Sequence, residues 1–284
     1  MIFRVHHVTQ YHYDRPVFLE PQIIRLTPRS DPNQRLTDFR MDVSPEPTGL
    51  SQYLDAEGNS VVKVWFDGTT QDLVIQSRFL ARTMRSNPFE FLLEREEDYM
   101  IPLVYPQADM DALARFCAHG PGKIVAASTY TQDVMEAARG ETLRFLHGLN
   151  QRIYEEFRIV VREEGGALEP DETLQRREVS CRDVALLFVE CARVVGLAAR
   201  FVSGYHSGYP DTRHRRLHAW AEVFLPGAGW IGYDPTLGLA VADSHIAVAA
   251  APTPAGAAAV TGSFRGSGVR SKMKTSLHLD VSRG

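Results

Sequence analysis

A helix with marked ends, followed by a pair of strands, constrains the fold of this chain more than any other feature. Apolar residues recur at helical spacing along residues 184–195, which predicts one buried face. Ser180 and Asp183 form a capping-box pattern, and Gly196 is placed to end the helix in a left-handed turn. The pattern therefore predicts a buried helix whose first residue is Cys181.

Cys181 is a candidate nucleophile because of this position. The first N–H groups of a helix lack partners within it and carry the positive end of the helix dipole. A thiol placed there is favoured in its thiolate form, which is the form that attacks carbonyl groups. The alternative is a small apolar residue that happens to begin a helix, and the helix alone does not distinguish the two interpretations.

The strand pair supplies candidate partners for the thiol. An alternating strand begins at His218, and after a turn a second strand ends at Asp234. If residues 225–229 form the loop, Phe224 opposes Trp230, and Asp234 lies on the same face as His218. His218 is then the predicted base and Asp234 the group that orients it. A loop one residue shorter would place Asp234 on the opposite face unless a bulge intervened.

Four motifs in this stretch resemble the core of the bacterial transglutaminase-like superfamily, whose members share a papain-like fold. The motifs are SCRD, GLAARFVSGY, HAWAEVFLPGAGW and IGYDPT, and their order is that of the family. The resemblance implies that Cys181 is the nucleophile, His218 the base and Asp234 the orienting acid. The chain departs from the family pattern at Val179, where glycine is usual, and at Leu237, where asparagine is favoured.

The resemblance also implies the chemistry, which is acyl transfer from an amide of a peptide or protein substrate through a cysteine thioester. No metal or organic cofactor is expected. The acyl acceptor is either an amine, as in a transglutaminase, or water, as in a cysteine peptidase or a deamidase, and no motif decides between them. A non-catalytic peptide-binding module on the same fold is the alternative from another class, and Val179 motivates it.

The rest of the chain divides into three predicted segments. Residues 1–95 alternate in short runs between prolines and turns, which predicts an antiparallel sandwich-like β-domain. The motif RLTPR within it also resembles the N-terminal domain of the family. Residues 96–245 are expected to hold helices and the papain-like core, and residues 246–284 an Ala/Gly-rich segment and a last strand. Residues 247–260 contain two prolines and are predicted to be irregular. The predicted fold class is α+β.

Composition excludes several classes of protein. A net charge of -4 gives no general attraction for nucleic acid or an anionic membrane. Cys117, Cys181 and Cys191 form neither a disulfide framework nor a metal-ligand pair, which suits a reducing compartment. The first residues lack the apolar core of a signal peptide, and no stretch is apolar enough to span a bilayer. A cytoplasmic location is expected.

Two groups of histidines raise the question of a metal. They are His6, His7 and His12 near the start of the chain, and His206, His214 and His218 near the candidate site. The first group has no acidic or cysteine partner at ligand spacing and is expected to be surface or hydrogen-bonded histidines. Arginines in the segment 213–216 would repel a cation from the second group. This segment is interpreted as a solvated loop, with a basic lip that favours acidic substrates as the alternative.

Overall fold

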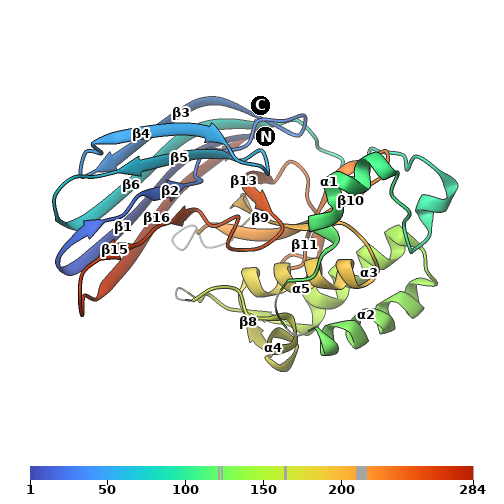
Figure 1. Cartoon of the computed structure of the whole chain (residues 1–284). Helices are drawn as coiled ribbons and strands as arrows, with labels where there is room; N and C mark the ends of the chain where they lie inside the picture. Colours follow the sequence, from blue (N-terminus) through green and yellow to red (C-terminus); the bar gives the residue numbers. More distant parts are fainter. Residues whose placement is uncertain (121, 123, 163–164, 209–215, 284) are drawn as a thin grey trace.

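The computed structural model describes residues 1–120, 122, 124–162, 165–208 and 216–283. Long strands form one side of the molecule (Figure 1). Helices packed on a separate sheet form the other side. The predicted α+β class is confirmed, with a β-domain at the N-terminus and a helix on an antiparallel sheet after it. No helix in the described part of the chain has the length and hydrophobicity to cross a lipid bilayer.

Two antiparallel sheets pack face to face in the N-terminal domain. The first contains β1 (Ile2–Leu19), β3 (Gln34–Ser44), β6 (Thr70–Thr83), β15 (Phe264–Arg265) and β16 (Ser271–Ser282). The second contains β2 (Gln22–Ile24), β4 (Gly49–Leu54), β5 (Ser60–Trp65) and β14 (Val260–Thr261). Leu73 and Ile75 of the first sheet pack with Ile24 and Val64 of the second, so alternating apolar residues build the core of a sandwich.

The last strand returns to the first sheet. β16 pairs antiparallel with β1 along its whole length, from Ser271 opposite Tyr13 to Ser282 opposite Ile2. The last strand predicted for residues 246–284 is therefore present, and it joins the first sheet of the N-terminal domain. Since β1 also pairs with β6 on its other side, β16 is an edge strand of this sheet.

A separate five-stranded sheet carries the helices. Its order is β12-β11-β10-β9-β13, with bounds β9 (Ala199–His206), β10 (His218–Leu225), β11 (Gly229–Asp234), β12 (Leu239–Ala240) and β13 (His245–Ala251). The helices are η1 (Glu96–Tyr99), α1 (Gln107–Cys117), α2 (Val125–Ala138), α3 (Thr142–Glu156), α4 (Pro170–Gln175) and α5 (Cys181–Val194). A short parallel pair, β7 (Arg158–Ile159) with β8 (Glu178–Val179), precedes α5. Helix α5 packs on β9 and β10, and α2 and α3 cover it from outside.

The Ala-rich segment corrects one expectation. Residues 247–260 were predicted to be irregular, but Ala247–Ala251 belong to β13, and the predicted boundary between residues 245 and 246 falls inside this strand. Alanine has a low strand propensity, so the local sequence carries little strand signal. Tertiary packing overrides it because β13 lies between two layers, where Ala249 packs with Phe201 and Ala250 packs with Trp220.

The two parts of the molecule share a packed interface. Tyr205 and Ile246 of the helix-bearing sheet pack with Phe3 and Val5 of β1. The Asn59 side chain reaches β13, where its Nδ2 donates to the Ala250 carbonyl at 2.9 Å and its Oδ1 accepts from the Ala250 N–H at 2.8 Å. The β-domain therefore covers the face of the sheet opposite α5.

Candidate active site

The start of α5 is fixed by the capping box that the sequence predicted. The backbone N–H and the hydroxyl of Ser180 both donate to Oδ2 of Asp183, at 2.7 and 2.8 Å. Asp183 is fully buried, and its other oxygen pairs with Arg162 and accepts the Leu168 N–H. These contacts hold Cys181 as the first residue of the helix.

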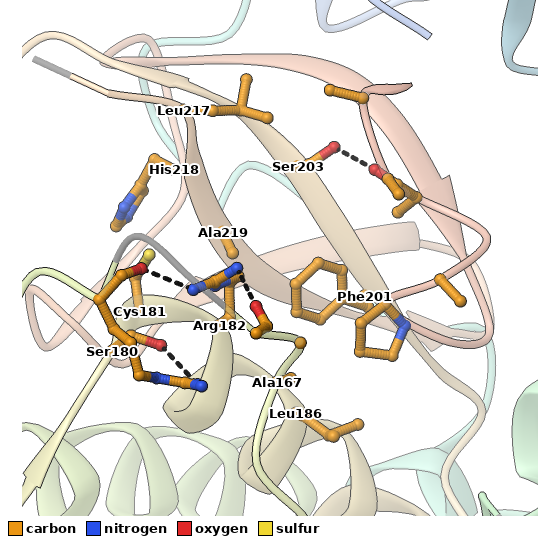
Figure 2. A pocket seen from close by; sticks show the side chains of 18 of the residues that line it. Ala167, Ser180, Cys181, Arg182, Leu186, Phe201, Ser203, Leu217, His218 and Ala219 are labelled. Carbon is orange, nitrogen blue, oxygen red and sulfur yellow. Dashed lines mark hydrogen bonds between the residues drawn. The ribbon is translucent and has the colours of Figure 1, made fainter. Parts of the chain in front are cut away.

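Cys181 and His218 line one cavity of about 1340 Å³. Cys181 is half-buried at the start of α5, and His218 reaches toward it from the first residue of β10 (Figure 2). Phe201 and Leu186 form an apolar part of the wall (Figure 2). The cavity thus gives a substrate access to Cys181, and the buried His218 lies beside this residue at the cavity wall.

The register of the β10–β11 hairpin brings His218 and Asp234 together. Phe224 pairs with Trp230, which is the pairing that the sequence analysis required. Asp234 and His218 consequently share a face, and Nε2 of His218 lies 2.7 Å from Oδ2 of Asp234. Both side chains are fully buried. The second oxygen of Asp234 accepts the Thr236 N–H at 2.9 Å, which fixes the carboxylate plane.

Opposing effects set the charge of this pair. Burial disfavours the charged form of His218, but the Asp234 carboxylate and the Cys181 side chain outweigh it and raise the pKa of His218 to about 10. Burial likewise disfavours the Asp234 anion, but the contacts with His218 and His245 outweigh it and hold the pKa of Asp234 well below its usual range. At neutral pH the pair is therefore an imidazolium and a carboxylate, with the Cys181 side chain against the same ring.

His245 is a site residue that the sequence analysis missed. Its Nε2 lies 3.0 Å from the same Oδ2 of Asp234 that bonds His218, and its Nδ1 lies 2.9 Å from the Ser244 hydroxyl. Burial lowers the pKa of His245 despite the neighbouring carboxylate, so this histidine is neutral. The sequence offered one signal, a histidine just before the Ala-rich segment. The local pattern did not show that this segment is a strand.

The histidines bear on the question of a metal. His218, Asp234 and His245 offer ligand atoms within 4.8 Å of one another, and no other such group of His, Cys, Asp and Glu exists among the described residues. We interpret them as a hydrogen-bonded network, because each Nε2 already lies at hydrogen-bond distance from the carboxylate. His214 and residues 213–215 of the suggested basic lip lie outside the described residues.

The histidines near the start of the chain are hydrogen-bonded strand residues, as expected. Nδ1 of His7 lies 2.9 Å from the Tyr205 hydroxyl, and His7 is buried. His12 pairs with Asp72 at 2.8 Å on the surface, and His6 contacts Gln76.

Two regions of the chain match known families. Residues 3–82 match the bacterial transglutaminase-like N-terminal region, and residues 128–235 match the transglutaminase-like superfamily. The second match contains Cys181, His218 and Asp234, and the first covers most of the sandwich.

Relatives and a solved structure align with most of the chain. An uncharacterized protein of Mycobacterium tuberculosis is 29% identical over 271 residues, which are 87% of this chain and 82% of the relative. One from Mycobacterium leprae is 26% identical over 286 residues, with 93% and 94% covered. A structure titled "Putative Cysteine Protease" from Cytophaga hutchinsonii has a TM-score of 0.73 and 18% identity, over 100% of this chain and 92% of that one. The whole fold, both parts included, is shared with that structure.

Proposed function

This chain belongs to the transglutaminase-like superfamily, and from that premise we propose that it is a thiol acyltransferase or hydrolase acting on peptide or side-chain amides. One observation carries the proposal. The imidazole of His218 lies between a buried carboxylate and the side chain of a cysteine at the start of a helix, inside a cavity. Such a chain of nucleophile, base and orienting group is the arrangement of a catalytic triad.

In the proposed reaction the Cys181 sulfur attacks the amide carbonyl and forms a carbon–sulfur bond. His218 gives its proton to the departing nitrogen, the carbon–nitrogen bond breaks, and a thioester remains on Cys181. An amine or water then attacks the thioester while His218 takes the proton of the acceptor, and the thiolate leaves. Asp234 holds the ring throughout. The backbone N–H of Cys181, which has no partner within α5, would stabilise the oxyanion.

The departures from the family pattern do not touch the cavity. Val179 is buried in the hydrophobic core, and its carbonyl accepts the Val160 N–H at 2.8 Å. Neither Val179 nor Leu237 is among the residues that line the cavity. The motive for a non-catalytic peptide-binding module is thereby weakened, and hydrolysis, as a cysteine peptidase or a deamidase, is the alternative outcome of the same thioester.

Alkylation by iodoacetamide tests the proposed pair of Cys181 and His218. We expect Cys181 to react at neutral pH, where a free cysteine with a pKa of about 8.5 is mostly protonated, at least tenfold faster than the other two cysteines. Burial raises the pKa of Cys191 to about 12 and also raises that of Cys117. Peptide mass spectrometry follows each site, and Cys117→Ala is the matched control.

The variant His218→Ala should abolish the fast reaction of Cys181. A reaction of Cys181 that shows the pH profile of an ordinary thiol and ignores His218→Ala would contradict the proposal and leave the binding module. Once the pair is established, incorporation of a fluorescent primary amine into a glutamine peptide, measured against ammonia release in water, identifies the acceptor.

A further inference from the structure

The cavity that holds Cys181 is also lined by the edge strand of the N-terminal domain. Besides catalytic side chains, its wall includes residues 272–275 and 277 of β16 and residues 159–162 after α3. In the cartoon, β16 is on the margin of the first sheet that faces the helical part (Figure 1). A substrate bound in this cavity can therefore contact a strand of the N-terminal domain.

One side of β16 is unpaired among the described residues. Its other side is fully paired with β1, and on the free side no backbone hydrogen bond is made within the described residues. Four consecutive residues, 272–275, line the cavity. Since successive side chains of a strand point to opposite faces, lining by consecutive residues means that the cavity reaches the edge of the strand and not just one face.

An extended segment forms the opposite wall. Arg158 and Ile159 pair with β8, and the Val160 N–H continues this pairing with the carbonyl of Val179. Residues 159–162 all line the cavity, and the Val161 side chain is 63% exposed although it is apolar. The cavity is thus bordered by extended backbone on two sides.

The two faces of β16 differ in chemistry. Lys272 and Lys274 share the solvent face, are exposed, and make no hydrogen bond or ion pair among the described residues. Met273 and Thr275 lie on the other face, opposite Tyr11 and Thr9 of β1, which also line the cavity. The wall at this end is therefore basic on the outside and, on the inside, formed by uncharged apolar and hydroxyl-bearing side chains.

We propose that the acyl donor is an extended peptide segment that adds as a further strand to the free edge of β16. Its alternate side chains would be acidic beside Lys272 and Lys274, and apolar or carboxamide where they point into the cavity. Main-chain hydrogen bonds to the edge supply affinity, and alternate side chains supply specificity. The inference rests on the proposed function for the role of the peptide as acyl donor, but its binding is measurable without any reaction.

Fluorescence anisotropy with the Cys181→Ala variant tests binding separately from chemistry. The probe is a labelled decapeptide of alternating glutamate and valine with one glutamine in place of a valine. Only every second N–H of an added strand bonds to the edge, so methylation of the backbone nitrogens in one alternate set should abolish binding. Methylation of the other set should leave most of it. Equal loss from both sets, or no binding by the unmodified peptide, would overturn strand addition.

Charge reversal on β16 provides the protein-side test. We expect the double substitution Lys272→Glu and Lys274→Glu to weaken binding of this probe at least tenfold, and added salt to weaken binding to the parent surface. Arg35→Glu is the matched control, because Arg35 is an exposed cation on β3, the opposite edge of the same sheet. An equal effect of Arg35→Glu would overturn the assignment to β16.

A blocked Gln-Gly dipeptide, too short to add as a strand, separates the two proposals. If the unsubstituted protein converts the dipeptide but Cys181→Ala does not bind the decapeptide, this inference fails and the proposed function stands. If the decapeptide binds and neither peptide is converted, the proposed function fails, and with it the role of the bound peptide as acyl donor. Binding together with at least tenfold better conversion of the decapeptide supports both.

Discussion

The same pair of residue types occurs in the first sheet of the N-terminal domain and in the helix-bearing sheet, with different surroundings. His12 and Asp72 of the N-terminal sheet lie 2.8 Å apart, with side chains 59% and 51% exposed. His218 and Asp234 of the helix-bearing sheet lie 2.7 Å apart, with both side chains fully buried. The surface pair is screened by water, whereas the buried pair must be held by its neighbours because unpaired charge is costly there. The distance between the two side chains therefore does not show which pair is suited to catalysis.

Both sheets are antiparallel, and the covering layers create this difference. The N-terminal sheet packs one face on the sandwich core and the interface and exposes the other, so β1 alternates between buried and exposed residues. The helix-bearing sheet lies between α5 and the β-domain, so every residue of β9 is buried. The N-terminal sheet keeps β16 as an edge strand, and the helix-bearing sheet buries the charged groups of the candidate site.

The largest loss of stability is expected from breaking an ion pair that is fully buried in the helical part of the molecule. Arg193 bonds Glu190 at 2.7 Å, and it also donates to the carbonyls of Phe116, Ala199 and Pro252. Among the described residues, Arg193→Met leaves Glu190 with the partly exposed His119 as its one possible cationic partner. We expect the substitution to lower the free energy of unfolding by about 3–5 kcal/mol. Urea denaturation measures the change.

The contrasting variant in the exposed sheet is Asp42→Ala, which removes ion pairs with Arg40 and Arg78. We expect no measurable shift in its urea midpoint, because solvent screens these charges. Similar losses for Arg193→Met and Asp42→Ala would refute the distinction drawn between the two parts.

A smaller effect should follow from removing the second histidine at Asp234. His245→Phe deletes one hydrogen bond to Oδ2 and leaves the carboxylate less firmly held. We expect about a tenfold slower alkylation of Cys181, equivalent to about 1.4 kcal/mol, with a displaced pH profile. His245→Gln, which can still donate, should recover most of the rate. A rate unchanged in His245→Phe would show that His218 is positioned without His245.

A still smaller effect than that of His245 concerns His7, at the interface of the two parts. Burial, and secondarily the charge of His6, lowers the pKa of His7 to about 4. An unfolded histidine titrates near 6.5, so between these values the unfolded chain binds a proton that the folded chain does not. Stability is complete above pH 6.5 and falls as the pH drops toward 4.

The variant His7→Gln has no titrating group at this position, so its unfolded chain does not bind the extra proton. The glutamine can still contact the Tyr205 hydroxyl. We expect the free energy of unfolding, measured by urea denaturation, to fall between pH 7.5 and pH 5.5 by about 1 kcal/mol less in the variant than in the parent. The exposed His12→Gln is the control and should lose as much as the parent. An identical pH dependence of the parent and His7→Gln would contradict the burial argument.

Local sequence determined the elements that carry the candidate site. The first turn of α5 follows from Ser180 and Asp183, whose contacts span three residues. Propensity and capping act over such distances, so the placement of Cys181 at a helix start could be predicted. The sequence left two hairpin registers open, and the structure decides between them by pairing Phe224 with Trp230, which puts His218 and Asp234 on one face.

Tertiary structure alone decided the rest. The Ala-rich strand β13 exists because two layers bury it, and with it came His245 on Asp234. The pairing of β16 with β1 brings together distant segments, with Ile2 opposite Ser282, and so puts an edge strand at the cavity. Such contacts depend on packing between segments far apart in sequence, and short-range patterns carry no record of which distant segment supplies the partner.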